Sequence, residues 1–371
     1  MFKKSRPHIE SKNDKTDSVI YFNGNIRNPY VDAGQQKAFL AKFDQSLANG
    51  AVVDLPENYY LSIVRFSISH AAIPIYFFRD NFYSVTINNT QVFLTYIQSG
   101  NGYNAYGFTG LQPVYYYQQI TKMVNIALKA AHDAEFGVEP NQEPFMTYDP
   151  VTEKFAMSIP SAYVNTGAYP YVFNVGRGIS FNSNLFQQFQ YFSATNNGLN
   201  QLLGKDYTLD LPTYSHFTNF VQYANPAAAL PIPPAGLVPA YNYFRIIQER
   251  SALYLFNEIQ SIVFSSSSLP TTKEFIGKND GSGNAGSVPI LVDFVPDQSA
   301  PRDLSQYQYV PNGPYKLINL TNSIPITSFD YQIGLATRSD VIYPLYLEPG
   351  EVCQVKFAFI KKSLFDNNFE Y

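Results

Sequence analysis

The sequence predicts a mainly β protein, a β-sandwich or jelly roll interrupted by a mixed α/β insertion. Three observations predict this fold class. The 371 residues include 30 Tyr and 30 Phe but only 4 His, 1 Cys and no Trp, and aromatic side chains fit the half-buried surface of a sheet. Short strand-like segments recur about every ten residues near the C-terminus, separated by Pro, Gly, Asn or Asp, as in sandwiches. One long helical pattern lies between two strand-rich blocks.

The first strand-rich block covers residues 19–110. Residues 18–25 are β-branched and aromatic and end at an Asn-Gly turn signal. Residues 58–68 are apolar on both alternating faces, which is typical of a strand buried on both sides. Residues 84–97 alternate around an Asn-Asn pair, and this pattern predicts a hairpin.

Residues 111–249 form the mixed region. Over residues 116–135, apolar side chains recur at helical spacing and predict one amphipathic helix. Its polar face is not strongly basic, so the apolar stripe is interpreted as a packing face rather than a membrane-binding one. Residues 145–159 predict a hairpin whose turn begins at an Asp-Pro pair.

Two further segments belong to this region. Residues 182–192 predict a short helix with Asn182 or Ser183 as its N-cap. Residues 223–242 are rich in proline, which forbids a regular helix or sheet. We interpret the proline-rich segment as a linker or as an ordered arm laid over a surface.

Strand signals resume in residues 250–371. The expected strands lie within residues 257–270, 287–297, 315–322, 328–337, 343–350 and 351–362. The economical interpretation is one sandwich domain built from residues 19–110 and 250–371, with residues 111–249 as an inserted domain. The alternative is two consecutive β domains.

Charged residues are scarce in this chain. They make up 15% of the sequence, against about 25% in a typical soluble domain. Such a surface suits extensive packing against other copies or partners, because few charges must be desolvated at the contact. An ordinary stable β protein is the alternative. The net charge of -4 argues against a general nucleic-acid binder.

The N-terminus departs from this charge balance. Residues 1–18 are predicted to form a disordered basic arm, with the cations Lys3, Lys4, Arg6, Lys12 and Lys15. Such an arm can make a weak contact with nucleic acid or with a neighbouring subunit, although most such runs are solvated tails. No segment approaches the roughly 20 apolar residues of a membrane helix, so we expect no membrane insertion.

We predict no catalytic, cofactor-binding or metal-binding residue, and the protein is expected not to be an enzyme. His8, His70, His132 and His216 are scattered and lack the spacing of zinc ligands. Each is interpreted as a hydrogen-bonding residue. The lone Cys353 excludes an internal disulfide and, in an alternating segment, is interpreted as a buried structural thiol.

The remaining polar motifs are interpreted as turns. Ser265 to Ser268 lack the flanking glycines of a nucleophile elbow, so their hydroxyls are expected to satisfy turn amides. Gly176 to Gly178 lack a phosphate-loop lysine, which favours a turn. A loop tip is expected, rather than a calcium site, at Asn279, Asp280 and Asn284.

Two aromatic runs have more than one interpretation. Tyr115 to Tyr117 and Tyr169 to Tyr171 could form a sugar-binding platform. Stacking on nucleic acid is disfavoured there, because neither run is interleaved with Arg or Lys. Packing at subunit contacts is the plainest use of a side chain that combines apolar area with one polar group.

The C-terminal third carries a family resemblance. IQSIVFSSSSLPTTKEFI is followed by PILVDFVPD, then by YKLINLTNSIPITSFDYQIGLAT and YPLYLEPGEVCQVKFAFIKKSLF. This order resembles the minor capsid, or penton, proteins of polinton-like viruses, adintoviruses and virophages. LPENYYLSIVRFSI resembles the first strands of such a protein more loosely, and residues 111–250 do not align to the family. None of these motifs is a chemical signature.

The resemblance implies a jelly roll that forms a homopentamer at the five-fold vertices of an icosahedral capsid. It implies a double jelly-roll major capsid protein as the neighbour, a virion assembled inside the host cell, and a genome that the N-terminal arm could contact weakly. The inserted domain would then be an outward-facing knob or a buttress. The alternatives are a double jelly-roll major capsid protein, a carbohydrate-binding host-attachment protein and a hydrolase on a β-sandwich.

Overall fold

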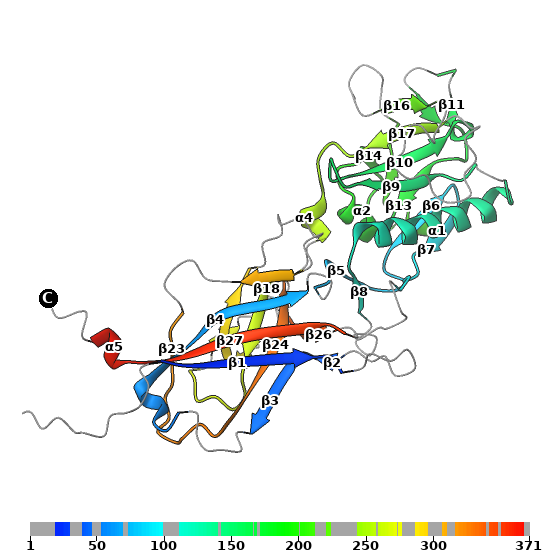
Figure 1. Cartoon of the computed structure of the whole chain (residues 1–371). Coiled ribbons are helices and arrows are strands. Elements are labelled where there is room, and N and C mark those ends of the chain that lie inside the picture. The colour runs from blue at the N-terminus through cyan, green and yellow to red at the C-terminus, as the bar shows by residue number, and fades with distance from the viewer. Residues whose placement is uncertain are drawn as a thin grey trace, which may run out of the picture. The chain divides into compact units, whose positions relative to one another are not determined.

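In the computed structural model the chain divides into two compact units (Figure 1). Unit 1 comprises the described residues up to 69 and those from 261 onward, and unit 2 comprises those from 73 to 260. The structure describes residues 19–29, 39–46, 53–69, 73–98, 111–139, 142–165, 167–168, 171–199, 201–211, 220–223, 243–256, 259–272, 274–276, 286–295, 306–309, 316–338, 341–347 and 350–366.

Unit 1 contains two larger antiparallel sheets. The first, here called the N/C sheet, has the strand order β1-β27-β4-β22, and β23 also pairs with β4. It joins both ends of the chain, drawn in blue and red in Figure 1. Its strands are β1 (Val19–Arg27), β27 (Val352–Lys361), β4 (Tyr59–Ser69), β22 (Gln306–Tyr309) and β23 (Ile318–Asn319).

The second sheet of unit 1 has the order β21-β18-β24-β25, and β3 also pairs with β24. Its strands are β21 (Ile290–Phe294), β18 (Ile259–Ser265), β24 (Ser328–Thr337), β25 (Ile342–Pro344) and β3 (Lys42–Ser46). Two short pairs accompany it: β2 (Phe39–Leu40) with β26 (Tyr346–Leu347), and β19 (Glu274–Ile276) with β20 (Gly286–Val288).

Aromatic side chains fill the space between the two sheets. The rings of Phe22 on β1 and Phe329 on β24 are 4.6 Å apart, centroid to centroid. The rings of Phe66 and Phe264 are 5.0 Å apart, as are those of Tyr331 and Phe357. Such pairs contribute beyond the area that they bury. Unit 1 is therefore a face-to-face sandwich of the jelly-roll class, as predicted.

Unit 2 combines two sheets with a long helix, α1 (Tyr117–Phe136), which packs against β9 of one sheet and against β6 and β7 of the other. The sheets have the orders β16-β17-β10-β9 and β14-β15-β13-β6-β7. Their strands are β16 (Phe220–Tyr223), β17 (Tyr243–Ile247), β10 (Lys154–Pro160), β9 (Phe145–Asp149), β14 (Ala194–Asn196), β15 (Tyr207–Leu209), β13 (Ile179–Phe181), β6 (Ser84–Ile87) and β7 (Thr90–Phe93).

The smaller elements of unit 2 complete its core. They are β5 (Tyr76–Phe78) paired with β8 (Gln112–Val114), β11 (Val164–Asn165) paired with β12 (Val172–Phe173), and the short helices α2 (Ser183–Gln188) and α4 (Leu253–Phe256). The buried face of α1 includes Ile120, Val124 and Leu128, which belong to the same apolar cluster as strand residues of both sheets.

Several predicted elements are confirmed. The helix expected at 116–135 is α1, and the two expected hairpins are β6–β7 and β9–β10. The short helix is α2, and its N-cap is Asn182 rather than Ser183, because the Asn182 side chain accepts a hydrogen bond from the Leu185 amide. These local signals were sufficient because each depends on residues close in sequence.

The boundary between the units differs from the prediction. Residues 73–98 and 250–260 belong to unit 2, whereas the sequence assigned them to the sandwich. The physical reason is the partner of β6, which pairs with β13 through Ile87 and Ile179. Outside the described residues lie the N-terminal arm, most of the proline-rich segment, the loop tip at 277–285, His8, His70 and His216.

Candidate functional sites

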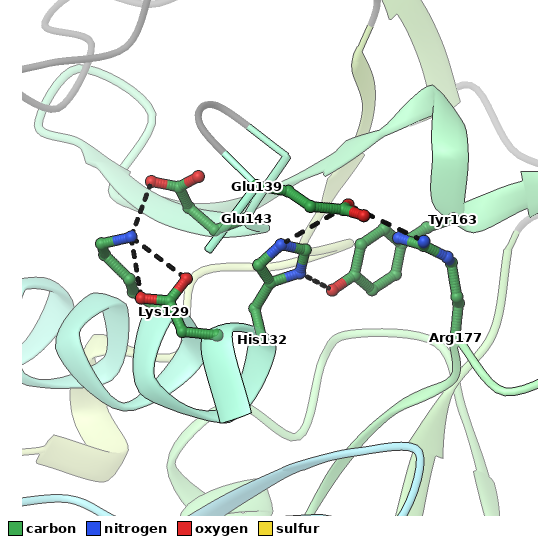
Figure 2. Close-up of polar contacts among 7 residues, drawn as sticks. Lys129, His132, Glu139, Glu143, Tyr163 and Arg177 are labelled. Carbon is green, nitrogen blue, oxygen red and sulfur yellow. Dashed lines mark hydrogen bonds and ion pairs between the residues drawn. The ribbon is translucent and has the colours of Figure 1, made fainter. Parts of the chain in front are cut away.

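A connected group of charged side chains in unit 2 surrounds the end of α1 (Figure 2). His132 follows the apolar stripe of α1 and is fully buried. Its Nδ1 lies 2.6 Å from the hydroxyl oxygen of Tyr163, just before β11. Among the described residues its Nε2 has no hydrogen-bond partner, and it lies 4.0 Å from Oε2 of Glu139. A proton on Nε2 would face that carboxylate and leave Nδ1 to accept from Tyr163.

Charged side chains flank the His132–Tyr163 pair on two sides and complete what is here called the cluster. Arg177 lies 3.8 Å from Glu139 and stacks its guanidinium 4.1 Å from the ring centroid of Phe136. On the helix surface, Lys129 lies 3.0 Å from Asp133, and it lies 3.8 Å from Glu143. The cluster therefore connects the last turns of α1 to the turn before β13 and to the segment that follows α1.

The two buried partners are held in their neutral forms. Burial lowers the pKa of His132, although the Glu139, Asp133 and Glu143 carboxylates oppose this shift. Burial also raises the pKa of Tyr163. A neutral imidazole bonded to a neutral phenol, with no serine or cysteine in the group, provides no activated nucleophile. The arrangement fastens elements together, as predicted for His132 as a hydrogen-bonding residue.

A second polar group lies in unit 1, where the serine turn after β18 surrounds the carboxylate of Asp330. The hydroxyls of Ser266, Ser267 and Ser268 donate to it at 3.0, 2.7 and 2.6 Å. The backbone amides of Ser267 and Ser268 donate to it as well. In addition, the oxygen of Ser266 accepts from the Leu269 amide.

This arrangement corrects one detail of the sequence interpretation. The Ser266 hydroxyl satisfies a turn amide as expected, but the main partner of the serine turn is a carboxylate on another strand. Burial alone would raise the pKa of Asp330, yet the hydrogen bonds from Ser268, Ser267 and Ser266 lower it to about 2. An ionised, hydrogen-bonded aspartate holds β24 against the end of β18 and does not activate the serines.

The other motif residues of the sequence make contacts that support the fold. Arg177 donates its amide to the Asn174 carbonyl at 3.0 Å, which closes the predicted turn. Tyr117 and Tyr171 pack on other rings, which gives no sugar platform at these two positions. Cys353 is fully buried, and burial raises the pKa of its thiol.

Metal ligation and membrane crossing find no support in the described part of the chain. Three or more His, Cys, Asp or Glu side chains nowhere gather there in a metal-binding arrangement. Within the same residues, no helix is both long and apolar enough to cross a membrane. That the chain has no catalytic, cofactor-binding or metal-binding residue stays a prediction.

The polar groups around Asp330 and His132 each join elements within their own unit of the chain. The chain belongs to the family described as Sputnik minor capsid protein V18/19, whose model matches residues 20–361. It is 29% identical over 220 residues to structural protein V19 of Sputnik virophage, an alignment that covers 58% of this chain and 94% of V19.

Two solved structures share the fold over nearly the whole chain. A chain of the Sputnik virophage cryo-EM structure has a TM-score of 0.69 at 26% identity, with 94% of this chain and 99% of that chain covered. The mavirus penton protein has a TM-score of 0.60 at 16% identity, with 93% and 99% covered. The resemblance seen in the sequence is confirmed, and the protein is a minor capsid protein of a virion.

Proposed function

We propose that five copies of this chain form a ring that occupies the five-fold vertices of an icosahedral capsid. One observation carries this proposal: the fold shared with a penton protein covers 93% of this chain and 99% of that one. The similarity therefore includes unit 2 as well as the sandwich. A shared jelly roll alone would be weaker support, because many unrelated proteins use that fold.

The exposed apolar residues of unit 1 support a ring. A closed ring uses two different surfaces of each subunit. Val295, next to β21 at an edge of the second sheet, is 72% exposed, and Ile324, in the segment before β24, is 66% exposed. Unit 1 thus presents apolar area at two separate positions that a neighbouring subunit can cover.

A position of this chain at the capsid vertex has two further consequences. Its role is non-enzymatic, and its neighbour in the capsid is a double jelly-roll major capsid protein. This chain is not itself built as two jelly rolls in its described residues, since α1 packs against both sheets of unit 2. The inserted domain, which we place at residues 71–260, serves as a knob or a buttress.

Native mass spectrometry of the full chain tests the ring, alone and mixed with the major capsid protein. We expect a species of five chain masses in at least one of these samples. Val295→Ser should weaken it, whereas Val151→Ser should not, because Val151 lies in the turn between β9 and β10. Only monomers or trimers under both conditions would overturn the proposal.

A further inference from the structure

The N/C sheet carries an unbalanced charge. Its strands contain the four cations Arg27, Arg65, Lys356 and Lys361, and none of these strands contains an Asp or a Glu. The facing sheet of the same sandwich has the opposite bias, because its strands contain three acids, Asp44, Asp293 and Asp330, and one lysine, Lys42. The excess of cations therefore belongs to one sheet of a chain whose net charge is -4. Three of the four, Arg27, Arg65 and Lys356, lie on the outer face of that sheet, whereas Lys361 is in phase with buried core residues of β27.

Two of these cations lie directly opposite each other. Lys356 on β27 pairs with Arg65 on β4 and, on its other side, with Asn23 on β1. All three point away from the core, since Val355 and Phe66 beside them are buried. Like charges that face each other across strands destabilise a sheet. This pair therefore favours a negatively charged partner outside the sheet.

The described residues provide no such partner. The side chains of Arg27 and Arg65 are exposed and form no hydrogen bond or ion pair within the described part of the chain. The carboxylates of Glu57 and Glu351 belong to the segments just before β4 and β27, which places them at the ends of the sheet. The central Lys356–Arg65 pair has no carboxylate on the strands around it.

Aromatic rings and amides lie between the cations on the same face. The Lys356 Nζ lies 4.4 Å from the ring centroid of Tyr21, and the Lys362 Nζ lies 5.1 Å from that of Tyr60. The next row of the sheet pairs Asn25 with Gln354. Cations interleaved with stacking rings and amide donors are the combination that binds nucleic-acid strands.

We propose that the outer face of the N/C sheet binds the nucleic acid packaged in the virion, through its phosphate backbone. An acidic protein segment would need the cations alone, whereas rings and amides among the cations favour nucleic acid. The proposed binding face lies within one subunit, so it does not depend on the number of subunits in the ring.

Fluorescence anisotropy with a labelled 30-nucleotide DNA, single-stranded and duplex, tests this inference on the full chain over a series of NaCl concentrations. The test variant is Arg65→Gln with Lys356→Gln. The control is Lys122→Gln with Arg250→Gln, two exposed cations of unit 2. Each lost phosphate contact reduces the magnitude of the slope of log K against log salt by about 0.9 for duplex DNA and by about 0.7 for a single strand. For the test variant we expect a decrease of about 1.8 with the duplex and about 1.4 with the single strand, and for the control no change.

A thermal melt separates this inference from a loss of folding. The test variant should melt no lower than the wild type, because a repulsive pair has been removed.

Four results would overturn the inference. Three concern binding: wild-type chain that does not bind DNA at low salt, an unchanged slope in the test variant, or binding of a poly-glutamate peptide without binding of DNA. The fourth is a test variant that loses its oligomers while its DNA binding stays intact, because the face is then a subunit contact. If the wild-type chain forms no pentamers but the test variant still lowers the salt dependence of DNA binding, the ring proposal fails and the nucleic-acid inference stands.

Discussion

Asp330 and Ser268 form a reciprocal pair across unit 1. The Ser268 hydroxyl donates to the Asp330 carboxylate at 2.6 Å, and the same hydroxyl oxygen accepts from the Asp330 amide at 2.9 Å. The pair joins β24 to the turn after β18 at a point where the carboxylate is almost fully buried. It holds together two segments that the sequence separates by 62 positions.

Asp330→Asn should destabilise unit 1. An amide keeps the volume but loses the charge, and its NH2 group faces serine hydroxyls that now lack their acceptor. We expect a loss of about 2–4 kcal/mol in the free energy of unfolding, measured by urea denaturation. Asp293→Asn is the matched control, because Asp293 is exposed on β21. A loss below about 0.5 kcal/mol in Asp330→Asn would contradict the assigned role.

The Asp330 carboxylate should make the stability of unit 1 depend on pH in the acid range. Its pKa in the folded chain is about 2, below the value of about 3.9 for an unfolded Asp. Its contribution, about 2–3 kcal/mol, is therefore complete above about pH 5 and is lost as the pH falls through 2. The difference in stability between wild type and Asp330→Asn should narrow over that interval. A difference that stays constant down to pH 2 would show that the charge is not responsible.

Gly24 and Tyr331 should be energetically coupled. A Cβ placed on Gly24 would overlap the hydroxyl oxygen of Tyr331, which is buried without a hydrogen-bond partner among the described residues. Gly24→Ala should cost about 1–3 kcal/mol by overpacking. Tyr331→Phe should be neutral or stabilising, because it removes an unsatisfied hydroxyl.

The double variant measures this coupling directly. Gly24→Ala with Tyr331→Phe should recover part of the loss, with a coupling energy of about 0.5–3 kcal/mol from a denaturation cycle. Strictly additive effects of the two substitutions would mean that the ring and the glycine do not contact each other.

The end of α1 should lose stability in mild acid. His132 has its pKa lowered by burial, so the unfolded chain, with a His pKa of about 6.5, takes up the proton first. The stability that depends on neutral His132 is present above pH 6.5 and declines below it. Hydrogen exchange of the α1 amides, corrected for intrinsic rates, should show less protection at pH 5 than at pH 7.5. His132→Phe should reduce that difference, and an equal difference in both proteins would refute the interpretation.

Asn182 should contribute more to the stability of the fold than an ordinary N-cap residue does. Its Oδ1 accepts from the amides of Leu185 and Ser84, both at 3.1 Å, and its Nδ2 donates to the Phe82 carbonyl at 2.9 Å. Asn182→Ala should cost about 2 kcal/mol in thermal or urea unfolding, at the upper end for caps. Asn184→Ala is the control, since Asn184 makes one bond, to the same Phe82 carbonyl. Equal losses in the two variants would contradict this ranking.

Short-range signals were sufficient for much of the fold. The spacing of apolar residues predicted α1 because a helix contacts its neighbours through residues three and four apart. The Asp-Pro pair located the β9–β10 hairpin for a similar reason. The alternating pattern of β6, by contrast, is the same whether the strand belongs to unit 1 or unit 2. Its pairing with β13 depends on residues distant in sequence, and this is why the boundary was misplaced.

Long-range polar contacts could not be predicted from one sequence. The serine turn was visible, but nothing near it indicated that Asp330 would be its partner. The sequence places His132 near the end of the predicted helix. Tyr163 and Arg177 come from later segments, and nothing in those segments indicates that they lie close to His132. The register of β1, β27 and β4, which places Lys356 opposite Arg65, also required the structure.

The most direct test of a vertex role is a cryo-EM reconstruction of particles assembled from this chain and the major capsid protein. We predict five copies around each five-fold axis, with the sandwich of unit 1 and the α1-containing unit 2 both fitting the vertex density. Vertices that are filled by another protein, or density for this chain in the major capsomers, would contradict it.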